Sequence, residues 1–269
     1  MIFVPGSITA FFSPEIHENP LKSGSLGVGI TVGMGVRATY LEGRIAVNGE
    51  TWDFPTVRYV VEKLGGGGIS ISMELPVGCG FGMSGASALA AAFETASARG
   101  VNAPFSRLAD LAHEAEVIHR TGLGDVVSQS HGGVVARLSP GCPSVAKVER
   151  FLWDAELDFL VLGKLDTSEI LESSLTSIQR EGKACLKEFM RNPTLFNLFR
   201  LSRSFAEKTG LMDDHVRDVI EAVEAAGGVA SMVMLGKTVF AYKGFDALKE
   251  FGMPFTSRID HCGVRVLGR

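Results

Sequence analysis

The hydrophobic pattern of the first 75 residues predicts β-strands and turns. The segment from Ser25 to Leu41 is rich in Gly, Val, Ile and Thr, and Arg44 to Val47 could pair back on it as a hairpin. From Pro55 to Leu64 the apolar residues recur at helical spacing, and a run of four glycines ends this helix. The alternating segment from Ile69 to Leu75 then predicts a strand that enters a glycine-rich loop.

Two predicted helices follow that loop in direct succession. The first, from Ser84 to Arg99, is rich in alanine and ends at a glycine. The second has Ser106 as its predicted N-cap, and its apolar positions recur at helical spacing. It leads into Thr121 to Asp125 (T-G-L-G-D), a turn bracketed by glycines that presents an acid. The patterns of Val134 to Leu138 and Val145 to Leu152 predict two strands after that turn.

Beyond about Asp154 the pattern changes, which indicates a domain boundary. A strand from Phe159 to Leu162 precedes three helices, which cover Ser168 to Met190, Pro193 to Lys208 and Asp214 to Ala226. A predicted hairpin with the two-residue turn Gly236-Lys237 follows, and then a short helix (Phe245 to Phe251) and a final strand (Arg258 to Leu267). This order predicts an α+β fold of two domains, residues 1–153 and 154–269, the second with an antiparallel sheet.

Composition narrows the classes of function. The chain has 269 residues, of which 46% are hydrophobic and 21% are charged, as expected for a globular protein with a core. A net charge of −4 without a basic run disfavours a nucleic-acid partner, and no apolar run approaches the ~18 residues of a membrane span. The four scattered cysteines argue against a zinc site or a disulfide framework, so we expect a reduced, cytoplasmic setting. The N-terminus shows no leader-peptide pattern.

The glycine-rich loop from Pro76 to Ser87 is the strongest functional signal. A strand, a glycine loop and a helix in this order can hold a phosphate, because loop N–H groups and the helix N-terminus both attract an anion. Gly80, Gly82 and Gly85 also match a dinucleotide-binding fingerprint, but a second helix follows in place of the strand and acid which that fold needs. No lysine follows the glycines directly, which disfavours a loop of the G-x-x-x-x-G-K-[ST] type.

The loop sequence Pro-x-x-x-Gly-Phe-Gly-x-Ser-Gly-Ala resembles the phosphate loop of the GHMP small-molecule kinases, which include galactokinase and the homoserine and mevalonate kinases. Pro5-Gly6-Ser7 stands where these kinases carry their first motif, and Glu116 to Asp125 is similar to their acidic segment. Within the family, T-G-L-G-D-V-V-x-Q and M-L-G-K-T-V-F resemble motifs of the archaeal pantoate kinases. The chain departs from the family at Met83, where many relatives have serine, and at Gly227 to Met232, where they have a run of glycines.

The resemblance implies an ATP- and Mg²⁺-dependent kinase with a ribosomal-protein-S5-like N-terminal domain and a ferredoxin-like C-terminal domain. The implied reaction transfers the ATP γ-phosphate to the hydroxyl of pantoate, a hydroxy acid, and gives 4-phosphopantoate for archaeal-type coenzyme A biosynthesis. The family also implies a homodimer.

The resemblance assigns roles to individual residues. Ser84 and Glu116 would bind magnesium, and Asp125 would accept the proton of the substrate hydroxyl; these three are the implied catalytic set. A carboxylate substrate would contact Ser25, His113 and Arg137. The ATP phosphates would lie on Pro76, Gly78, Gly80, Phe81, Gly82, Met83, Ser84, Gly85, Ala86 and Ser87.

Each candidate also has an ordinary structural explanation. Ser84 could be a helix N-cap, Asp125 could cap the next helix, and Glu114 is a rival for Glu116 in the adjacent register. The substrate-binding candidates could be a solvated strand arginine, a surface histidine and a loop serine. Lys22, His131 and the pair Thr167-Ser168 are weaker candidates for substrate contacts.

Three other functions stay open at this point. One is a GHMP kinase of the mevalonate or homoserine type. Another is a nucleotide-binding regulator that has lost catalysis, although the joint presence of Ser84, Glu116 and Asp125 speaks against it. The third is an oxidoreductase on a dinucleotide-binding core.

Overall fold

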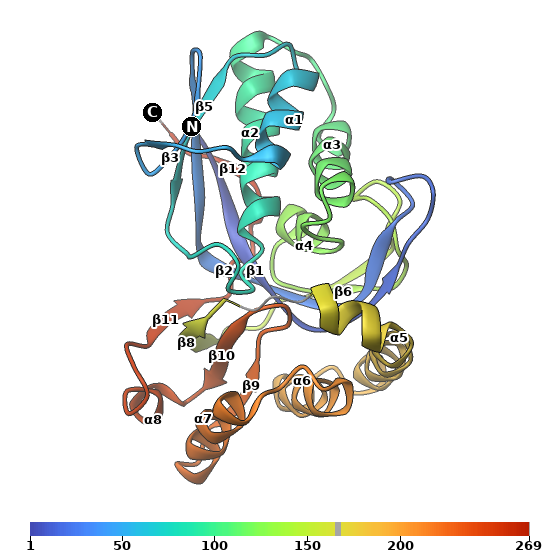
Figure 1. The fold of residues 1–269 in the computed structure, drawn as a ribbon, viewed down its shortest axis with the longest axis vertical. Helices are drawn as coiled ribbons and strands as arrows, with labels where there is room; N and C mark the ends of the chain where they lie inside the picture. Colours follow the sequence, from blue (N-terminus) through green and yellow to red (C-terminus); the bar gives the residue numbers. More distant parts are fainter. Residues whose placement is uncertain (165–167, 269) are drawn as a thin grey trace.

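A long hairpin of β1 (Ile2–Glu15) and β2 (Gly24–Leu41) forms the centre of the first sheet in the computed structural model, which describes residues 1–164 and 168–268. Two register shifts interrupt the pairing, one between Pro5 and Gly6 and one between Thr9 and Phe11. Such irregularities bend a strand. The first part of β1 therefore packs beneath the helices of the N-terminal half, whereas the second part packs on the C-terminal helices (Figure 1).

The strand order of the first sheet is β12-β1-β2-β5-β3-β4. The second half of β2 pairs with β5 (Gly68–Met73), and its first half pairs with β6 (Val134–Arg137), which in turn pairs with β7 (Val148–Phe151). The predicted return of Arg44 to Val47 onto the preceding strand is wrong. Because β1 and β5 already occupy both edges of that part of β2, β3 (Ile45–Val47) pairs in parallel with β5 and carries the short β4 (Glu50–Thr51).

Four helices cover one face of this sheet (Figure 1): α1 (Pro55–Lys63), α2 (Met83–Arg99), α3 (Phe105–Ile118) and α4 (Asp125–His131). The alanine-rich α2 contacts both α1 and α3, and its small side chains are buried against β1 and β2. The prediction of Ser106 as an N-cap is wrong, because the N-cap of α3 is the extended Pro104, two residues earlier. A proline suits the start of a helix, where its missing N–H is not needed.

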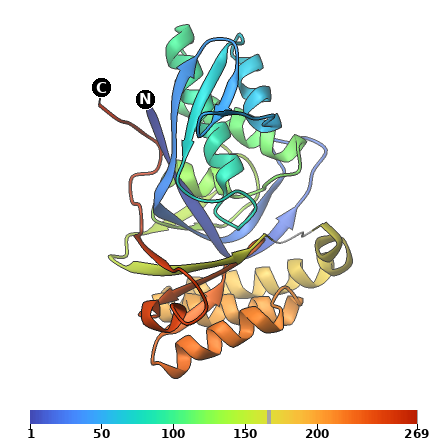
Figure 2. The same cartoon turned by 60° about the vertical axis from the view of Figure 1, so that its left-hand side comes forward.

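The C-terminal half contains β8 (Glu156–Gly163), β9 (Val229–Met232), β10 (Lys237–Tyr242) and β11 (Phe255–Arg258), and helices α5 (Ser168–Arg191), α6 (Leu195–Thr209), α7 (Asp214–Ala225) and α8 (Phe245–Leu248). The strands form an antiparallel sheet in the order β11-β8-β10-β9. This is the strand order of a ferredoxin-like fold, and α5, α6 and α7 form the outermost layer (Figure 2). The predicted α+β class is confirmed.

Two further details of the sequence prediction are wrong in this half. The turn between β9 and β10 is longer than two residues, since Val233 N donates to Thr238 O (2.8 Å) and Leu235 has a φ of 63°. The predicted final strand is divided, because Asp260 Oδ1 accepts hydrogen bonds from the backbone N–H groups of Cys262 and Gly263, which forms a turn.

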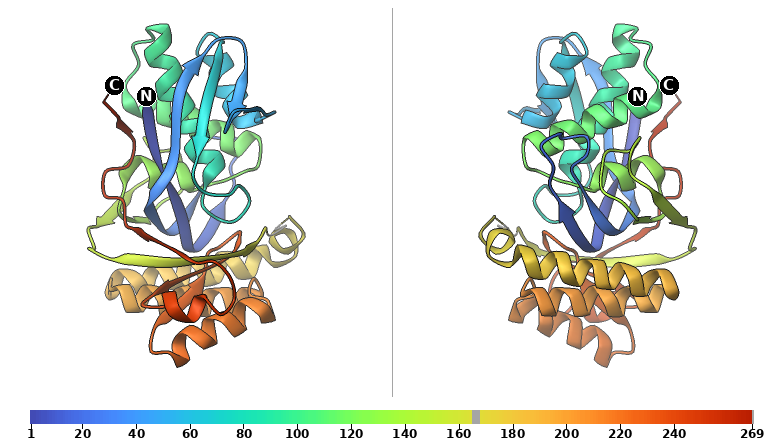
Figure 3. Two further views of the ribbon diagram at one scale, coloured as in Figure 1. Left: turned by 90° about the vertical axis from the view of Figure 1, so that its left-hand side faces the viewer. Right: turned by 90° about the vertical axis from the view of Figure 1, so that its right-hand side faces the viewer.

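The end of the chain returns to the first sheet. After that turn, β12 (Arg265–Val266) pairs with the start of β1, so the two termini lie close together (Figure 3). The division into residues 1–153 and 154–269 stays a prediction, and the last strand belongs to the first sheet in any case. Among the described residues, no helix combines the length and the apolar character that a bilayer span requires.

Candidate active site

The loop between β5 and α2 has the backbone of an anion cradle. Gly78, Gly80 and Gly82 have φ values of 80°, 90° and 61°, a region that L side chains rarely adopt. Gly82 is the N-cap of α2, and in the described part of the chain that helix start has no side-chain cap and no acidic residue in its first turn. Its first N–H groups and its dipole therefore face the loop, which favours a phosphate.

The second sheet holds this loop from behind. A Cβ at Gly80 would come within 2.6 Å of Val233 Cγ1 and 3.3 Å of the Gly236 Cα, and the Thr238 hydroxyl donates to Cys79 O (2.8 Å). The segment that contacts the loop, Val233 to Thr238, therefore directly follows the expected third motif, Gly227 to Met232. This contact between the two halves was not predicted from the sequence, because nothing local in a hairpin turn indicates its partner.

The side chains of the loop divide into those that support it and those that face the site. Phe81 is buried between the sheets, with its ring centroid 5.7 Å from that of Phe159. Met83, Ala86 and Ser87 are also buried, and the Ala86 N–H is already bonded to Gly82 O. Pro76 and Gly78 are exposed and Ser84 is half-buried. Only the backbone of the supporting residues is therefore available to a phosphate.

Ser84 and Glu116 lie together at the start of α2. The Ser84 hydroxyl donates to Glu116 Oε1 (2.5 Å), and Thr121 Oγ1 donates to the same oxygen (2.6 Å). Thr56 Oγ1 lies 3.2 Å from Ser84 Oγ. Ser84 is the second residue of the helix and not its N-cap. Glu116 is 2% exposed, and burial raises its pKa to about 7 although both hydroxyls act in the opposite direction.

The rival Glu114 lies elsewhere. Burial and the neighbouring Glu114 carboxylate raise the pKa of Tyr59, so this acid lies beside Tyr59, whereas the Ser84 hydroxyl donates to Glu116. The two glutamates are only two residues apart, and a helix directs such residues to different faces. The helical register therefore leaves Glu116 as the acid in contact with the loop helix.

Asp125 is the second acid of the site. It is the first residue of α4, and among the described residues its side chain accepts from the Ser7 hydroxyl on β1 (Oδ1, 2.8 Å) and not from an N–H group of that helix. A Cβ at Gly122 would clash with Glu116 Oε2 and lie 3.5 Å from Asp125 Oδ2, so the two carboxylates flank this glycine. Burial raises the pKa of Asp125, and the Ser7 hydroxyl and the Arg137 guanidinium oppose that effect.

Arg137 supplies a buried positive charge next to Asp125. Its Nε donates to Ser25 O (3.1 Å) and its Nη1 to Ser128 Oγ (2.8 Å), while Nη2 has no hydrogen-bond partner among the described residues. It is 1% exposed, and burial lowers its pKa to about 10, so it stays protonated at neutral pH. The alternative of a solvated strand arginine is therefore wrong.

His113 and Ser25 are also buried, so neither is a surface residue. His113 Nε2 lies 2.8 Å from Ser23 O, and since a carbonyl only accepts, Nε2 must carry the hydrogen. Burial lowers the pKa of His113. His113 and Arg137 thus hold the start of β2, from Ser23 to Ser25, by its backbone, which positions Ser25 beside Gly124, where a Cβ would lie 2.5 Å from Ser25 Oγ.

Comparison with known proteins places this geometry in a family. The GHMP kinases N terminal domain family matches residues 53–133, which include the loop and both acids. The pantoate kinase of Thermococcus kodakarensis is 37% identical over 94% of this chain and 93% of its own length. The pantoate kinase of Methanocaldococcus jannaschii is 35% identical over 93% of this chain and 94% of its own length.

The chain belongs to the GHMP kinase family. A solved structure described as a phosphotransferase related to the CoA biosynthesis pathway is 32% identical, covers 98% of both chains and has a TM-score of 0.87. A mevalonate kinase structure has a TM-score of 0.70 at 12% identity, and it shares the fold of this chain. The expected resemblance to GHMP kinases is confirmed.

Several residues of this GHMP kinase site were not singled out as site residues from the sequence. They are Ser7, Thr56, Thr121, Gln129 and Thr238, whose side chains all bond to the loop or to its acids. Each is a small polar residue or amide, and only the hydrogen bond that its side chain makes in the folded chain distinguishes it. Of the weaker candidates, Thr167 lies outside the described residues, and His131 Nδ1 contacts Val127 O within its own helix.

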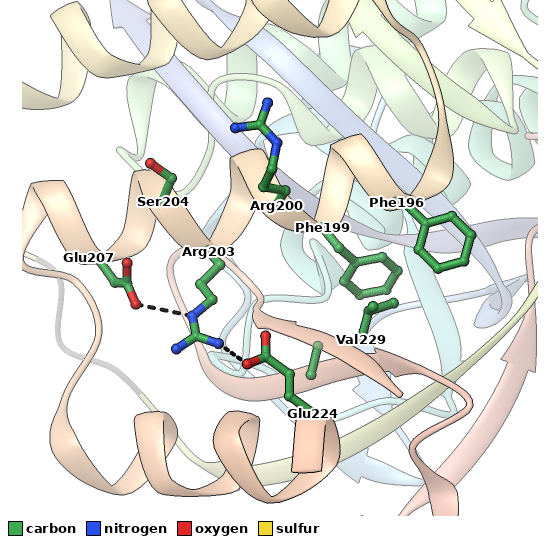
Figure 4. Close-up of a pocket in the computed structure, with 9 residues that line it drawn as sticks. Phe196, Phe199, Arg200, Arg203, Ser204, Glu207, Glu224 and Val229 are labelled. Atoms are coloured by element: carbon green, nitrogen blue, oxygen red, sulfur yellow. Dashed lines mark hydrogen bonds and ion pairs between the residues drawn. The ribbon is translucent and has the colours of Figure 1, made fainter. Parts of the chain in front are cut away.

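A hollow of about 310 Å³ lies apart from the site, between α6, α7 and β9 (Figure 4). Its apolar side is formed by Phe196, Phe199 and Val229. Its central cation, Arg203, donates to Glu207 Oε1 (3.1 Å) and to Glu224, as the dashed lines in Figure 4 show. These two carboxylates pair with Arg203, and Glu188 pairs with Arg200, so both guanidinium groups that line the hollow already have a carboxylate partner.

Proposed function

We propose that this GHMP kinase transfers the γ-phosphate of ATP to the hydroxyl of pantoate and gives 4-phosphopantoate, a step toward coenzyme A. The observation that carries the proposal is the buried Arg137 guanidinium, whose Nη2 has no hydrogen-bond partner among the described residues and whose charge acts on Asp125. Relatives named pantoate kinase match nearly the whole chain at 31–37% identity, and they support this choice of hydroxy acid.

Arg137 is suited to the carboxylate of the substrate. A buried guanidinium without a direct carboxylate partner is costly, since its charge has lost the solvation of water. Its Nε and Nη1 are held by Ser25 O and Ser128 Oγ, which leaves Nη2 for an anion. A substrate carboxylate would neutralise this charge and place the hydroxyl of the same molecule near Asp125.

Asp125 is suited to accept the proton of that hydroxyl. Its Oδ1 is occupied by the Ser7 hydroxyl, and Oδ2 faces the Gly122 turn. As the substrate oxygen forms its bond to the γ-phosphorus, the bond from that phosphorus to the β,γ-bridging oxygen breaks and ADP leaves. The hydroxyl proton passes to Asp125. The loop N–H groups and the start of α2 hold the phosphates during the transfer.

Ser84 and Glu116 are suited to hold Mg²⁺. The donor set consists of a hydroxyl and a carboxylate oxygen only 2.5 Å apart beside the phosphate loop. The described residues contain no cluster of three or more His, Cys, Asp or Glu side chains suited to a metal, and Mg²⁺ commonly takes one or two carboxylates and completes its shell with phosphates and water. When bound, Mg²⁺ neutralises charge on the phosphates.

The proposal is tested by a substrate panel. Purified protein with MgATP is given pantoate, mevalonate or homoserine in separate reactions, ADP release is measured, and phosphorus NMR identifies the product. We expect ADP release only in the reaction with pantoate, and 4-phosphopantoate as its product. ADP release with mevalonate or homoserine but not with pantoate would keep the kinase family and overturn the substrate.

Replacing Asp125 by Asn separates an enzyme from a nucleotide-binding regulator. The substitution keeps the shape and the acceptor for Ser7 but removes the base. We expect turnover to fall by roughly 100- to 10,000-fold, while ATP binding measured by calorimetry is retained. Unchanged turnover in Asp125→Asn would overturn the catalytic role.

The use of Mg²⁺, a homodimer and a cytoplasmic location belong to the same proposal.

A further inference from the structure

Gln129 lies at the junction of the phosphate loop and the catalytic acid. It is one helical turn after Asp125 on α4 and is fully buried. Its Nε2 donates to Gly82 O (2.8 Å), at the N-cap of α2, and to Ser7 Oγ (3.1 Å) on β1. One amide group therefore connects the loop, the central strand and the helix that carries Asp125.

The direction of these hydrogen bonds follows from the chemistry of the partners. Gly82 O is a carbonyl and can only accept, so the Gln129 amide must turn its NH₂ group toward it. The same NH₂ group then donates to the Ser7 hydroxyl. Because Ser7 has a single proton and already accepts from Gln129, that proton is free to point at Asp125 Oδ1, 2.8 Å away.

We propose that Ser7 and Gln129 are positioning residues for phosphoryl transfer: Gln129 fixes the direction of the Ser7 hydroxyl, and Ser7 holds the Asp125 carboxylate in place as the proton acceptor. The inference rests on the proposed role of Asp125. It leaves Oδ2 of Asp125 for the substrate hydroxyl and ties the position of that acid to Gly82 of the phosphate loop.

A purely structural role explains Gln129 less well. Its Oε1 is buried without a partner among the described residues, and it lies on the side of Gly85, where a Cβ would be 3.2 Å away. A buried acceptor without a hydrogen bond costs about 1–3 kcal/mol. A methionine of similar size would fill the same volume without that cost. The backbone of Ser7 is fixed independently, because its N–H donates to Phe81 O (2.9 Å).

The test uses three single variants of the full chain and one double variant, which combines Ser7→Ala with Gln129→Met. Ser7→Ala removes the donor to Asp125, and Gln129→Met keeps the volume but removes the amide. The matched control is Gln179→Met, because Gln179 is the other glutamine of the chain and its Nε2 donates to Pro14 O (2.8 Å) and not to Ser7, Gly82 or Asp125. Steady-state kinetics with MgATP and pantoate, ATP binding and thermal unfolding are measured for each.

We expect kcat to fall roughly 10- to 100-fold in Ser7→Ala and in Gln129→Met, the size of effect that misplacing a reacting group produces. Gln179→Met should match the wild type. Since Gln129 acts through Ser7, the double variant should be no slower than Ser7→Ala. Ser7→Ala should also shift the acidic limb of the kcat/KM profile to higher pH, because Asp125 then faces only Arg137 and Glu116 without its donor.

Two outcomes would overturn the inference. One is kcat in Ser7→Ala and Gln129→Met equal to that of Gln179→Met, and the other is a double variant whose loss is the product of the single losses. Retained ATP binding shows that a slow variant is folded. If Asp125→Asn itself keeps full turnover, the proposed role of Asp125 is wrong, and this inference fails with it. If Asp125→Asn is inactive while both positioning variants are normal, only this inference fails.

Discussion

Replacing Glu116 by Gln should stabilise the protein without nucleotide while it abolishes magnesium-dependent activity. Glu116 is almost fully buried, and its Oε1 accepts hydrogen bonds from the Ser84 and Thr121 hydroxyls. Glutamine has nearly the same shape and keeps an acceptor oxygen for both donors. The substitution therefore removes the ionisable group and leaves the packing around it.

The size of the effect follows from the pKa of Glu116, which burial raises from 4.5 to about 7. Below pH 4.5 the carboxyl group is protonated in both the folded and the unfolded state. As the pH rises from 4.5 to 7, only the unfolded chain releases this proton, so the free energy of unfolding falls. The interval is about 2.5 pH units at ~1.4 kcal/mol each, so ionised Glu116 costs ~3 kcal/mol of stability above pH 7.

The assay is urea unfolding of wild type and Glu116→Gln at several pH values, without divalent cations. We expect the variant to be more stable by ~3 kcal/mol at pH 8, with the difference falling toward zero near pH 4.5. Glu114→Gln, on the same helix but facing Tyr59, is the matched control, because it leaves the hydrogen bonds of Ser84 and Thr121 to Glu116 in place. A Glu116→Gln variant that is no more stable than wild type at pH 8 would refute the reasoning.

The remaining predictions concern substrate and nucleotide binding. Arg137→Lys keeps the charge but loses the planar fork, so we expect KM for pantoate to rise roughly tenfold with little change in KM for ATP, measured by initial rates. Thr238→Val leaves the buried Cys79 carbonyl without its donor and should cost about 1–2 kcal/mol of stability and weaken ATP binding. Thr238→Ser keeps the hydroxyl and should behave like wild type; if Val and Ser variants bind ATP equally well, the hydrogen bond does not hold the loop.

Local sequence was sufficient for most helices and for the phosphate loop. Alternate glycines, small residues and an alanine-rich helix are short-range signals, and the structure gives Gly78, Gly80 and Gly82 the positive φ values that such a loop requires. The order of strands and helices beyond Asp154 was likewise sufficient for an antiparallel sheet covered by helices. These features depend on residues that are close together in the chain.

Strand partners and element ends were harder to predict. Arg44 to Val47 has the pattern of a strand, but such a pattern does not show which strand it will pair with. In the structure β5 pairs with β2, and β3 therefore pairs with β5. The final strand is broken because the Asp260 carboxylate binds two backbone N–H groups, and an aspartate in a sequence does not reveal its acceptor role.

The sequence by itself determined the α+β class, the phosphate loop and the pair of acids that follow it, since each is encoded in a continuous segment. Only the tertiary structure decided the environment of those acids. Ser7 on β1 bonds to Asp125 and Ser84 on α2 bonds to Glu116, and Arg137 becomes a buried charge only because β6 pairs with β2 beneath α4. Burial and hydrogen bonding set the pKa of a carboxyl group, and both depend on residues distant in the chain.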